Sequence, residues 1–245
     1  MTKLKIDLAN GLSMQRGLNL VCRNAFPRLP LVTKRSYFTS AAFILAIDFH
    51  EAISNNLESG SHAVAAALLR PIWECGIAAA WVLYRADEEQ LLRLYANPLD
   101  LEHLWIDEAD LPTPTRMLKQ LKETGLVEEY ARNHEALMEG NGKFFHKYTH
   151  VTVFQLKRTF VTSDTPTGFS DADQMAILTL ADTLLLACAA VFQAQTQDQD
   201  LNLYIQYRFE RLRSDVPNLN AQLPQWKPLP DPREAIVADE PPDRA

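Results

Sequence analysis

An uninterrupted apolar run constrains this chain more than any other feature. Met175–Phe192 (MAILTLADTLLLACAAVF) has the length of a short membrane span, but it carries Asp182 near its centre. A charged side chain at the centre of a bilayer costs about 2.5–3.5 kcal/mol on insertion scales. A second long stretch, Ala63–Tyr84, is interrupted in the same way by Arg70 and Glu74. Both stretches therefore predict buried helices of a bundle, and no membrane is expected as a partner.

The remaining long segments also have helical character. Ala, Leu, Glu and Gln dominate them, and there is no sustained alternation of apolar and polar residues, which would indicate strands. We therefore expect an all-α fold, a multi-helix bundle of about six to nine helices with four long ones forming the core. This single domain should cover residues 1–213. Prolines gather near the C-terminus, so residues 214–245 are expected to form an extended or disordered Pro-rich tail.

Turn and capping residues divide the bundle into segments. Ser170-x-x-Asp173 resembles a capping box, which indicates the start of a helix. Pro71 predicts a kink, because proline removes a backbone hydrogen bond from a helix interior. Gly140-Asn141-Gly142 is expected to separate two helices. The expected helices cover residues 3–22, 37–57, 61–85, 87–95, 115–124, 127–139, 144–162, 170–194 and 198–213.

Charge and cysteine content exclude several classes of protein. A net charge of −7 and a pI of about 5.4 exclude a globally basic nucleic-acid coat. The three cysteines form no CxxC pair, and the N-terminus lacks the apolar run of a signal peptide, so a cytoplasmic protein is expected. The chain has no nucleophile elbow, P-loop or dinucleotide fingerprint. We expect no cofactor.

Two groups of polar residues on expected helices carry the candidate chemistry. Arg70 and Glu74 are one helical turn apart on an otherwise apolar face, so they should pair with each other. His146, His150 and Arg158 recur at multiples of four residues and wind slowly around one side of the 144–162 helix. Such a row could bind a phosphate, act in acid/base catalysis or be structural. We expect no metal site, although a third ligand for the two histidines could come from Asp48, His50, Glu51 or Glu74.

The last expected helix interleaves aromatic residues with arginines, in the segment Tyr204–Arg213. This pattern could stack on single-stranded nucleic acid and neutralise its backbone. It is equally typical of a helix with one apolar face and a solvated basic end, because cations favour the C-terminus of the helix dipole. We favour the second interpretation.

Two short motifs resemble those of a known group of proteins. Arg70-Pro71-x-x-Glu74, and Tyr148-Thr149-His150 followed by Gln155 and Arg158, resemble an uncharacterised family of bacterial all-helical proteins over roughly residues 40–190. The resemblance implies no activity, only that these polar residues belong together. Many such members have glycine directly after the Tyr-Thr-His segment, where this chain has valine.

More distantly, the chain is similar to the HEPN superfamily of helical bundles (higher eukaryote and prokaryote nucleotide-binding domains), which includes abortive-infection and toxin ribonucleases. The usual HEPN motif is arginine, four to six residues, then histidine. No arginine of this chain has a histidine at that spacing. The departure weakens a ribonuclease interpretation, although Arg70 could supply the cation from another helix.

Two functional hypotheses follow. The first is a binding or regulatory module in which Arg70, Glu74 and the Tyr148/His150/Arg158 group form a polar network that fixes the bundle or holds a small anionic ligand. The second is a metal-independent ribonuclease of toxin or phage-defence type. Its catalytic candidates are Arg70, Glu74, His150 and Arg158, and its binding candidates are Tyr148, Gln155 and His146. A homodimer, RNA and a small anionic ligand are the partners to consider.

Overall fold

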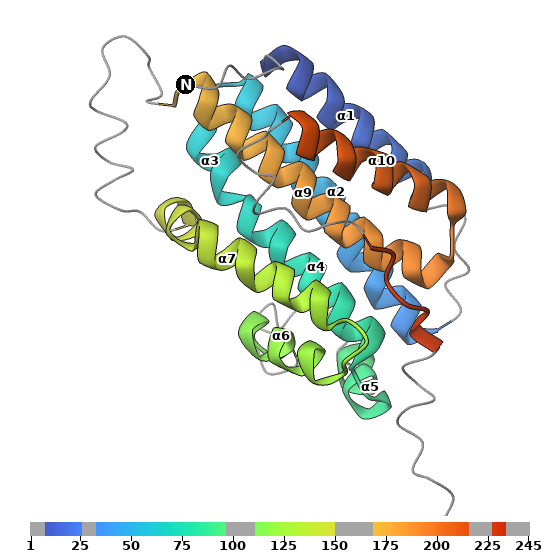
Figure 1. The fold of residues 1–245 in the computed structure, drawn as a ribbon. Helices are drawn as coiled ribbons and strands as arrows, with labels where there is room; N and C mark the ends of the chain where they lie inside the picture. Colours follow the sequence, from blue (N-terminus) through green and yellow to red (C-terminus); the bar gives the residue numbers. More distant parts are fainter. Residues whose placement is uncertain (1–7, 26–32, 97–110, 150–168, 216–226, 234–245) are drawn as a thin grey trace, which may run out of the picture.

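The computed structural model describes residues 8–25, 33–96, 111–149, 169–215 and 227–233. Over these ranges nearly every residue is helical or in a short turn, which confirms the expected all-α bundle (Figure 1). The helices are α1 (Leu8–Ala25), α2 (Lys34–Glu58), α3 (His62–Ala67), α4 (Leu69–Tyr84), α5 (Glu88–Ala96), α6 (Pro114–Glu123), α7 (Glu128–Thr149), α9 (Asp171–Thr196) and α10 (Gln199–Asp215).

Helix α9 is the central helix of the bundle. It packs against α4, α2, α10 and α1, and almost all of its residues from Gln174 to Ala194 are buried. A helix that is apolar on every side gains from neighbours on every side, which explains this position. By length and composition α9 and the α3–α4 stretch would both suffice to cross a membrane, but 89% of the relevant window of α9 is buried inside the protein. The cytoplasmic location stays a prediction.

The predicted kink at Pro71 is confirmed as a break between α3 and α4. Helix α3 ends at Ala67 and α4 begins at Leu69, with a turn residue between them. Pro71 has no N–H to donate to the carbonyl four residues earlier, so the helical ladder is interrupted here. The predicted capping box is also present, since the Ser170 hydroxyl accepts from the Asp173 N–H at 3.2 Å and Asp173 accepts from the Ser170 N–H at 2.9 Å.

One predicted boundary is wrong. Gly140-Asn141-Gly142 does not separate two helices, because α7 continues through it from Glu128 to Thr149. A glycine inside a helix costs about 1 kcal/mol relative to alanine, which weakens a helix without ending it. The rest of the expected 144–162 helix, from residue 150 onward, lies outside the described residues.

The expected C-terminal tail is described in two parts. Ser214 and Asp215 form the end of α10, and residues 227–233 lie against the bundle with only Pro232 and Arg233 in a helical turn. Leu229 packs on the hydrophobic core. The remaining tail residues are not described. We call residues 227–230 the strap, because they link α4 and α7 as shown below.

Candidate functional site

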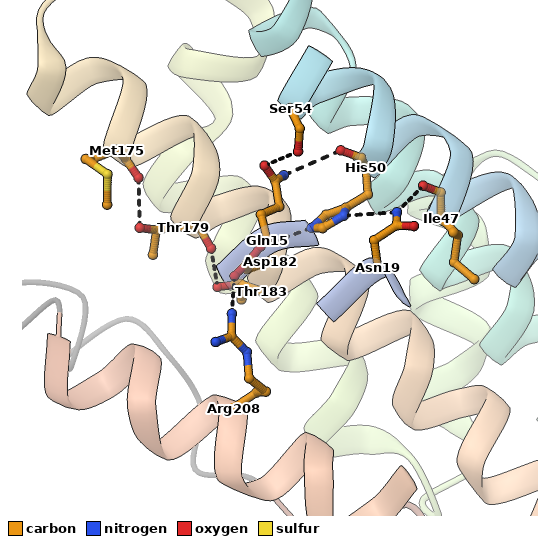
Figure 2. Close-up of polar contacts among 10 residues, drawn as sticks. All are labelled: Gln15, Asn19, Ile47, His50, Ser54, Met175, Thr179, Asp182, Thr183 and Arg208. Atoms are coloured by element: carbon orange, nitrogen blue, oxygen red, sulfur yellow. Dashed lines mark hydrogen bonds and ion pairs between the residues drawn. The ribbon is translucent and has the colours of Figure 1, made fainter. Parts of the chain in front are cut away.

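A cluster of buried polar side chains joins four helices at the centre of the bundle (Figure 2). Asp182 of α9 accepts from the Arg208 guanidinium of α10 at 2.6 Å, and its other oxygen lies 3.0 Å from Nε2 of His50 on α2. The three residues are 5%, 4% and 0% exposed, respectively. Both carboxylate oxygens of Asp182 are therefore engaged, and the charge that made the apolar run unsuitable for a bilayer is paired with a buried arginine.

The neighbours of His50 define its tautomer. The Asn19 amide of α1 donates to the Ile47 carbonyl at 2.9 Å, and its nitrogen lies 3.5 Å from Nδ1 of His50. Since Asn19 Oδ1 accepts from Arg23, the amide nitrogen is the group that faces His50. Nδ1 is then the acceptor, and Nε2 carries the hydrogen that Asp182 accepts.

The cluster continues to the protein surface through α1. Arg23 donates to Asp48 at 2.9 Å and to Glu51 at 2.5 Å, so two of the candidate metal ligands are occupied by an arginine. Burial lowers the pKa of Arg23, but its hydrogen bonds to the two carboxylates outweigh this and raise the pKa overall. Deeper in the bundle, Ser54 donates to Gln15 at 2.5 Å. These contacts connect α1, α2, α9 and α10. We call the residues that make them the polar clasp: Gln15, Asn19, Arg23, His50, Ser54, Asp182 and Arg208.

A cavity of about 250 Å³ lies beside the polar clasp, between α7, α9, α10 and the strap. Its wall is mostly apolar. The lining residues include Val127, Tyr130, Asn133, His134, Leu137, Thr183, Ala187, Ala190, Phe209, Lys227, Pro228, Leu229 and Pro230. Because the strap forms one of its walls, the cavity has this shape only when this C-terminal part of the chain lies on the bundle.

His134 is the exceptional residue in the wall of this cavity. It is only 2% exposed, and neither ring nitrogen has a hydrogen-bond partner in the described part of the chain. Burial lowers its pKa from 6.5 to about 3, so the ring is neutral at neutral pH. Both nitrogens are themselves buried, and the Cε1 atom between them faces Gly76 of α4, so this edge of the ring points away from the cavity.

Gly76 and Tyr130 place the imidazole of His134. The Tyr130 ring lies 4.4 Å from the His134 ring, and its hydroxyl donates to the Gly76 carbonyl at 3.0 Å. A Cβ at position 76 would lie 3.3 Å from the Tyr130 hydroxyl and 3.5 Å from Cε1 of His134. Because Gly76 has no side chain, α7 can approach α4 closely at this position, and the His134 ring packs against the α4 backbone.

Two contacts hold the strap in place. The Tyr84 hydroxyl of α4 donates to the Pro230 carbonyl at 2.7 Å, and the Lys227 ammonium lies 2.8 Å from the Glu129 carboxylate of α7. The tyrosine is buried, whereas the ion pair is exposed to solvent. Besides this part-buried hydrogen bond and the exposed ion pair, the packing of Leu229 on the core also holds the strap.

The sequence-predicted site residues are only partly described. Arg70 and Glu74 form the expected ion pair at 2.8 Å, but each side chain is 38% exposed, so the pair is not a sealed core element. Glu74 also lines an apolar groove of about 590 Å³ between α2, α4 and residues 111–117. His146 and Tyr148 lie on α7, where only the backbone is described, and His150, Gln155 and Arg158 lie outside the described residues. Their grouping into one site stays a prediction.

Sequence reasoning did not single out Asp182, Arg208 and His134 as site residues. The expected apolar face and solvated basic end of the last helix are both present, since Phe209 and Leu212 are buried and Arg211 is exposed. Arg208, which lies one turn before this end, is buried instead, and the signal that could have found it is the charge of Asp182 in an apolar helix. No sequence signal marked His134. Within the described ranges, no group of three or more His, Cys, Asp or Glu side chains could hold a metal ion.

Comparison with known proteins adds a family. A model of a family of unknown function, DUF6988, matches residues 43–217. The chain belongs to the DUF6988 family. The matched segment contains His50, Asp182, Arg208 and His134 of this DUF6988 protein, whereas α1 and the strap lie outside it. No curated protein and no solved structure matched the chain.

Proposed function

We propose that this DUF6988 protein binds a small molecule in the cavity beside His134. The observation that supports the proposal is the mostly apolar cavity of about 250 Å³ between α7, α9, α10 and the strap, with the buried His134 ring in its wall. Protein interiors are close-packed, and few voids exceed the size of a water molecule. An apolar cavity of about 150 Å³ already accepts benzene, so this one has room for a larger ligand.

The polar clasp acts as the scaffold of the binding site in this proposal. Thr183, one residue after Asp182, lines the cavity, and so does Phe209, which follows Arg208. The ion pair between Asp182 and Arg208 therefore fixes the positions of two wall residues on α9 and α10. His50 is fully buried and bonded on both ring nitrogens, which suits a structural role.

The strap gives the proposed ligand a route to the cavity. Three helices form the other walls, and helices packed by core residues open less readily than a segment held by few contacts. The strap is held by the Tyr84 hydrogen bond, the exposed Lys227–Glu129 pair and the packing of Leu229. The cavity is already partly open to solvent, and displacing the strap would widen this opening at the cost of the packing of Leu229 on the core.

This proposal retains the binding function expected from the sequence but changes its location. The expected site was built on Arg70, Glu74, His150 and Arg158, and the last two are not described. The ribonuclease alternative depends on the same undescribed residues, so no described contact favours it. It stays a prediction, to be tested by RNA cleavage.

A thermal-shift screen with small, weakly polar compounds tests the proposal. A ligand present at 100 times its Kd stabilises the folded state by about 2.7 kcal/mol, which raises Tm by about 5–10 °C for a chain of this size. Ala187→Phe should fill the cavity and abolish the shift, with Ala187→Leu as the milder variant if the first fails to fold. Ala78→Phe is the matched control, because Ala78 lines the groove on the other side of α4 instead.

The variants separate the outcomes of the screen. Binding that survives both Ala187 variants but is lost in Ala78→Phe would place the ligand in the groove and refute the proposal. A screen in which no compound raises Tm at millimolar concentration would also refute it. Loss of binding in the Ala187 variants alone supports the cavity.

A further inference from the structure

We infer that the surface beneath the strap is a docking site for a proline-rich peptide of another protein, and that the strap fills this site in cis. The inference goes beyond the proposed function, because it does not require a small molecule in the cavity. We call the surface the strap seat: Tyr84 of α4, Glu129 of α7 and the part of the core that Leu229 covers. Three features carry the inference, namely the stiffness of the strap, its contacts with the seat and its place in the chain.

The strap has little conformational freedom to lose when it docks. Every residue from Lys227 to Pro232 is either a proline or the residue before one. Proline fixes φ at about −65°, and the residue before a proline is restricted to extended conformations. The segment from Lys227 to Asp231 is accordingly neither helical nor in a strand. Because a preformed extended segment loses little entropy on docking, a few contacts suffice to hold it, and a free peptide of the same sequence keeps this advantage.

The contacts of the strap seat suit a peptide of this composition. Prolines have no N–H, so the carbonyls are the main-chain groups that they offer for hydrogen bonds. The Tyr84 hydroxyl donates to such a carbonyl, that of Pro230, at 2.7 Å. Leu229 is half-buried against the core, and the Lys227 ammonium lies 2.8 Å from the Glu129 carboxylate. The seat therefore fits a basic residue, a proline, an aliphatic residue and a second proline in that order, which is the chemistry of the inferred partner.

The strap and its seat belong to different parts of the chain. The DUF6988 model matches residues 43–217, which include Tyr84 and Glu129 but not the strap. The strap is joined to the end of α10 through residues 216–226. A segment tethered in this way competes for its seat at an effective concentration on the order of 1 mM. A partner's peptide has to displace the strap, so weakening the strap should strengthen the binding of the peptide.

A fluorescent peptide that copies residues 227–233 tests the inference by anisotropy on the full-length protein. In Lys227→Glu the strap meets a like charge at Glu129, which weakens its docking in cis. We expect the apparent Kd of the peptide to be about 3- to 10-fold lower for this variant than for the wild-type protein. Arg16→Glu is the matched control, because it makes the same change of charge in another exposed ion pair, the one with Glu58, and it should leave the Kd unchanged.

Exchanging the charges locates the peptide on the strap seat. A second peptide carries the change Lys227→Glu and should bind the wild-type protein less tightly than the first. In the protein variant Glu129→Lys the order of the two peptides should be reversed, because the second peptide now meets the opposite charge. A third peptide with Leu229→Asp should bind none of these proteins, because its docking would bring a charge against the core.

Several results would overturn the inference. Equal binding of the first peptide to Lys227→Glu and Arg16→Glu would show that the strap does not compete for the site. A preference that Glu129→Lys fails to reverse would place the peptide elsewhere, and no binding at several millimolar peptide would exclude the docking site. A dimer of the wild-type protein in sedimentation velocity that Lys227→Glu weakens would make the strap of a second copy the occupant instead. None of these results depends on the screen for cavity ligands.

Discussion

Replacing His134 with phenylalanine should remove much of the sensitivity of the fold to mild acid. Burial lowers the pKa of this imidazole from 6.5 to about 3 in the folded protein. Between these two values the unfolded chain binds a proton that the folded chain does not. Stability therefore falls as the pH drops through this window, and none of this effect is present well above pH 6.5.

The size of the effect follows from the same two values. Each unit of difference in pKa corresponds to about 1.36 kcal/mol. A pH of 5 is about 1.5 units below the pKa of the imidazole in the unfolded chain. His134 should therefore lower the free energy of unfolding at pH 5 by about 2 kcal/mol relative to pH 8. The full difference of about 3.5 units, roughly 5 kcal/mol, would be reached only below about pH 3.

Urea denaturation of the wild-type protein and His134→Phe at pH 8 and pH 5 measures this difference. The carboxylates and other histidines are common to both proteins, so their contributions cancel in the comparison. The pH-dependent loss of stability should be smaller in the variant by about 2 kcal/mol. Equal losses in the two proteins would refute the reasoning, because they would show that the folded imidazole titrates at its ordinary pKa or has a proton-accepting partner.

Three further predictions concern contacts elsewhere in the bundle. Asp182→Ala should lower the free energy of unfolding by about 3–5 kcal/mol, because it leaves a buried arginine unpaired, and the added change Arg208→Met should restore part of the loss in urea denaturation. Arg70→Ala should cost no more than about 1 kcal/mol in the same assay, because the Arg70–Glu74 pair is substantially exposed. Tyr84→Phe should increase hydrogen exchange at the amides of Lys227 and Leu229 by about 3- to 10-fold, because it removes the hydroxyl that binds the Pro230 carbonyl; Pro228 and Pro230 have no amide hydrogen, and unchanged exchange would show that the packing of the strap suffices.

The elements that could be predicted from the sequence are those that local chemistry determines. The apolar run predicted the buried helix α9, Pro71 predicted the break before α4, and the Ser170–Asp173 spacing predicted a capping box that is present. Arg70 and Glu74 pair as expected because residues four apart on a helix are neighbours whatever the tertiary structure. The helix through Gly140 and Gly142 shows the limit of this reasoning, since the rest of the helix can offset weak local propensity.

The candidate site depends on long-range packing, which a single sequence does not display. His50 meets Asp182 across 132 residues, and the Tyr84 hydroxyl meets the strap across 146. The cavity is the space left where α7, α9, α10 and the strap meet, so no motif encodes it. Asp182 did signal the need for a partner, but several arginines and histidines could have supplied it.

The two contacts of Asp182 close loops of very different length, and this difference affects the order in which the contacts form during folding. Arg208 is 26 residues from Asp182, whereas His50 is 132 residues away. Closing the longer loop costs about 1.4 kcal/mol more in chain entropy. The α9–α10 hairpin can therefore form its ion pair before α1 and α2 dock, so that the carboxylate is already neutralised when they cover it. Weakening the Asp182–Arg208 pair should then slow folding, whereas weakening the contacts of His50 and Asn19 should mainly speed unfolding.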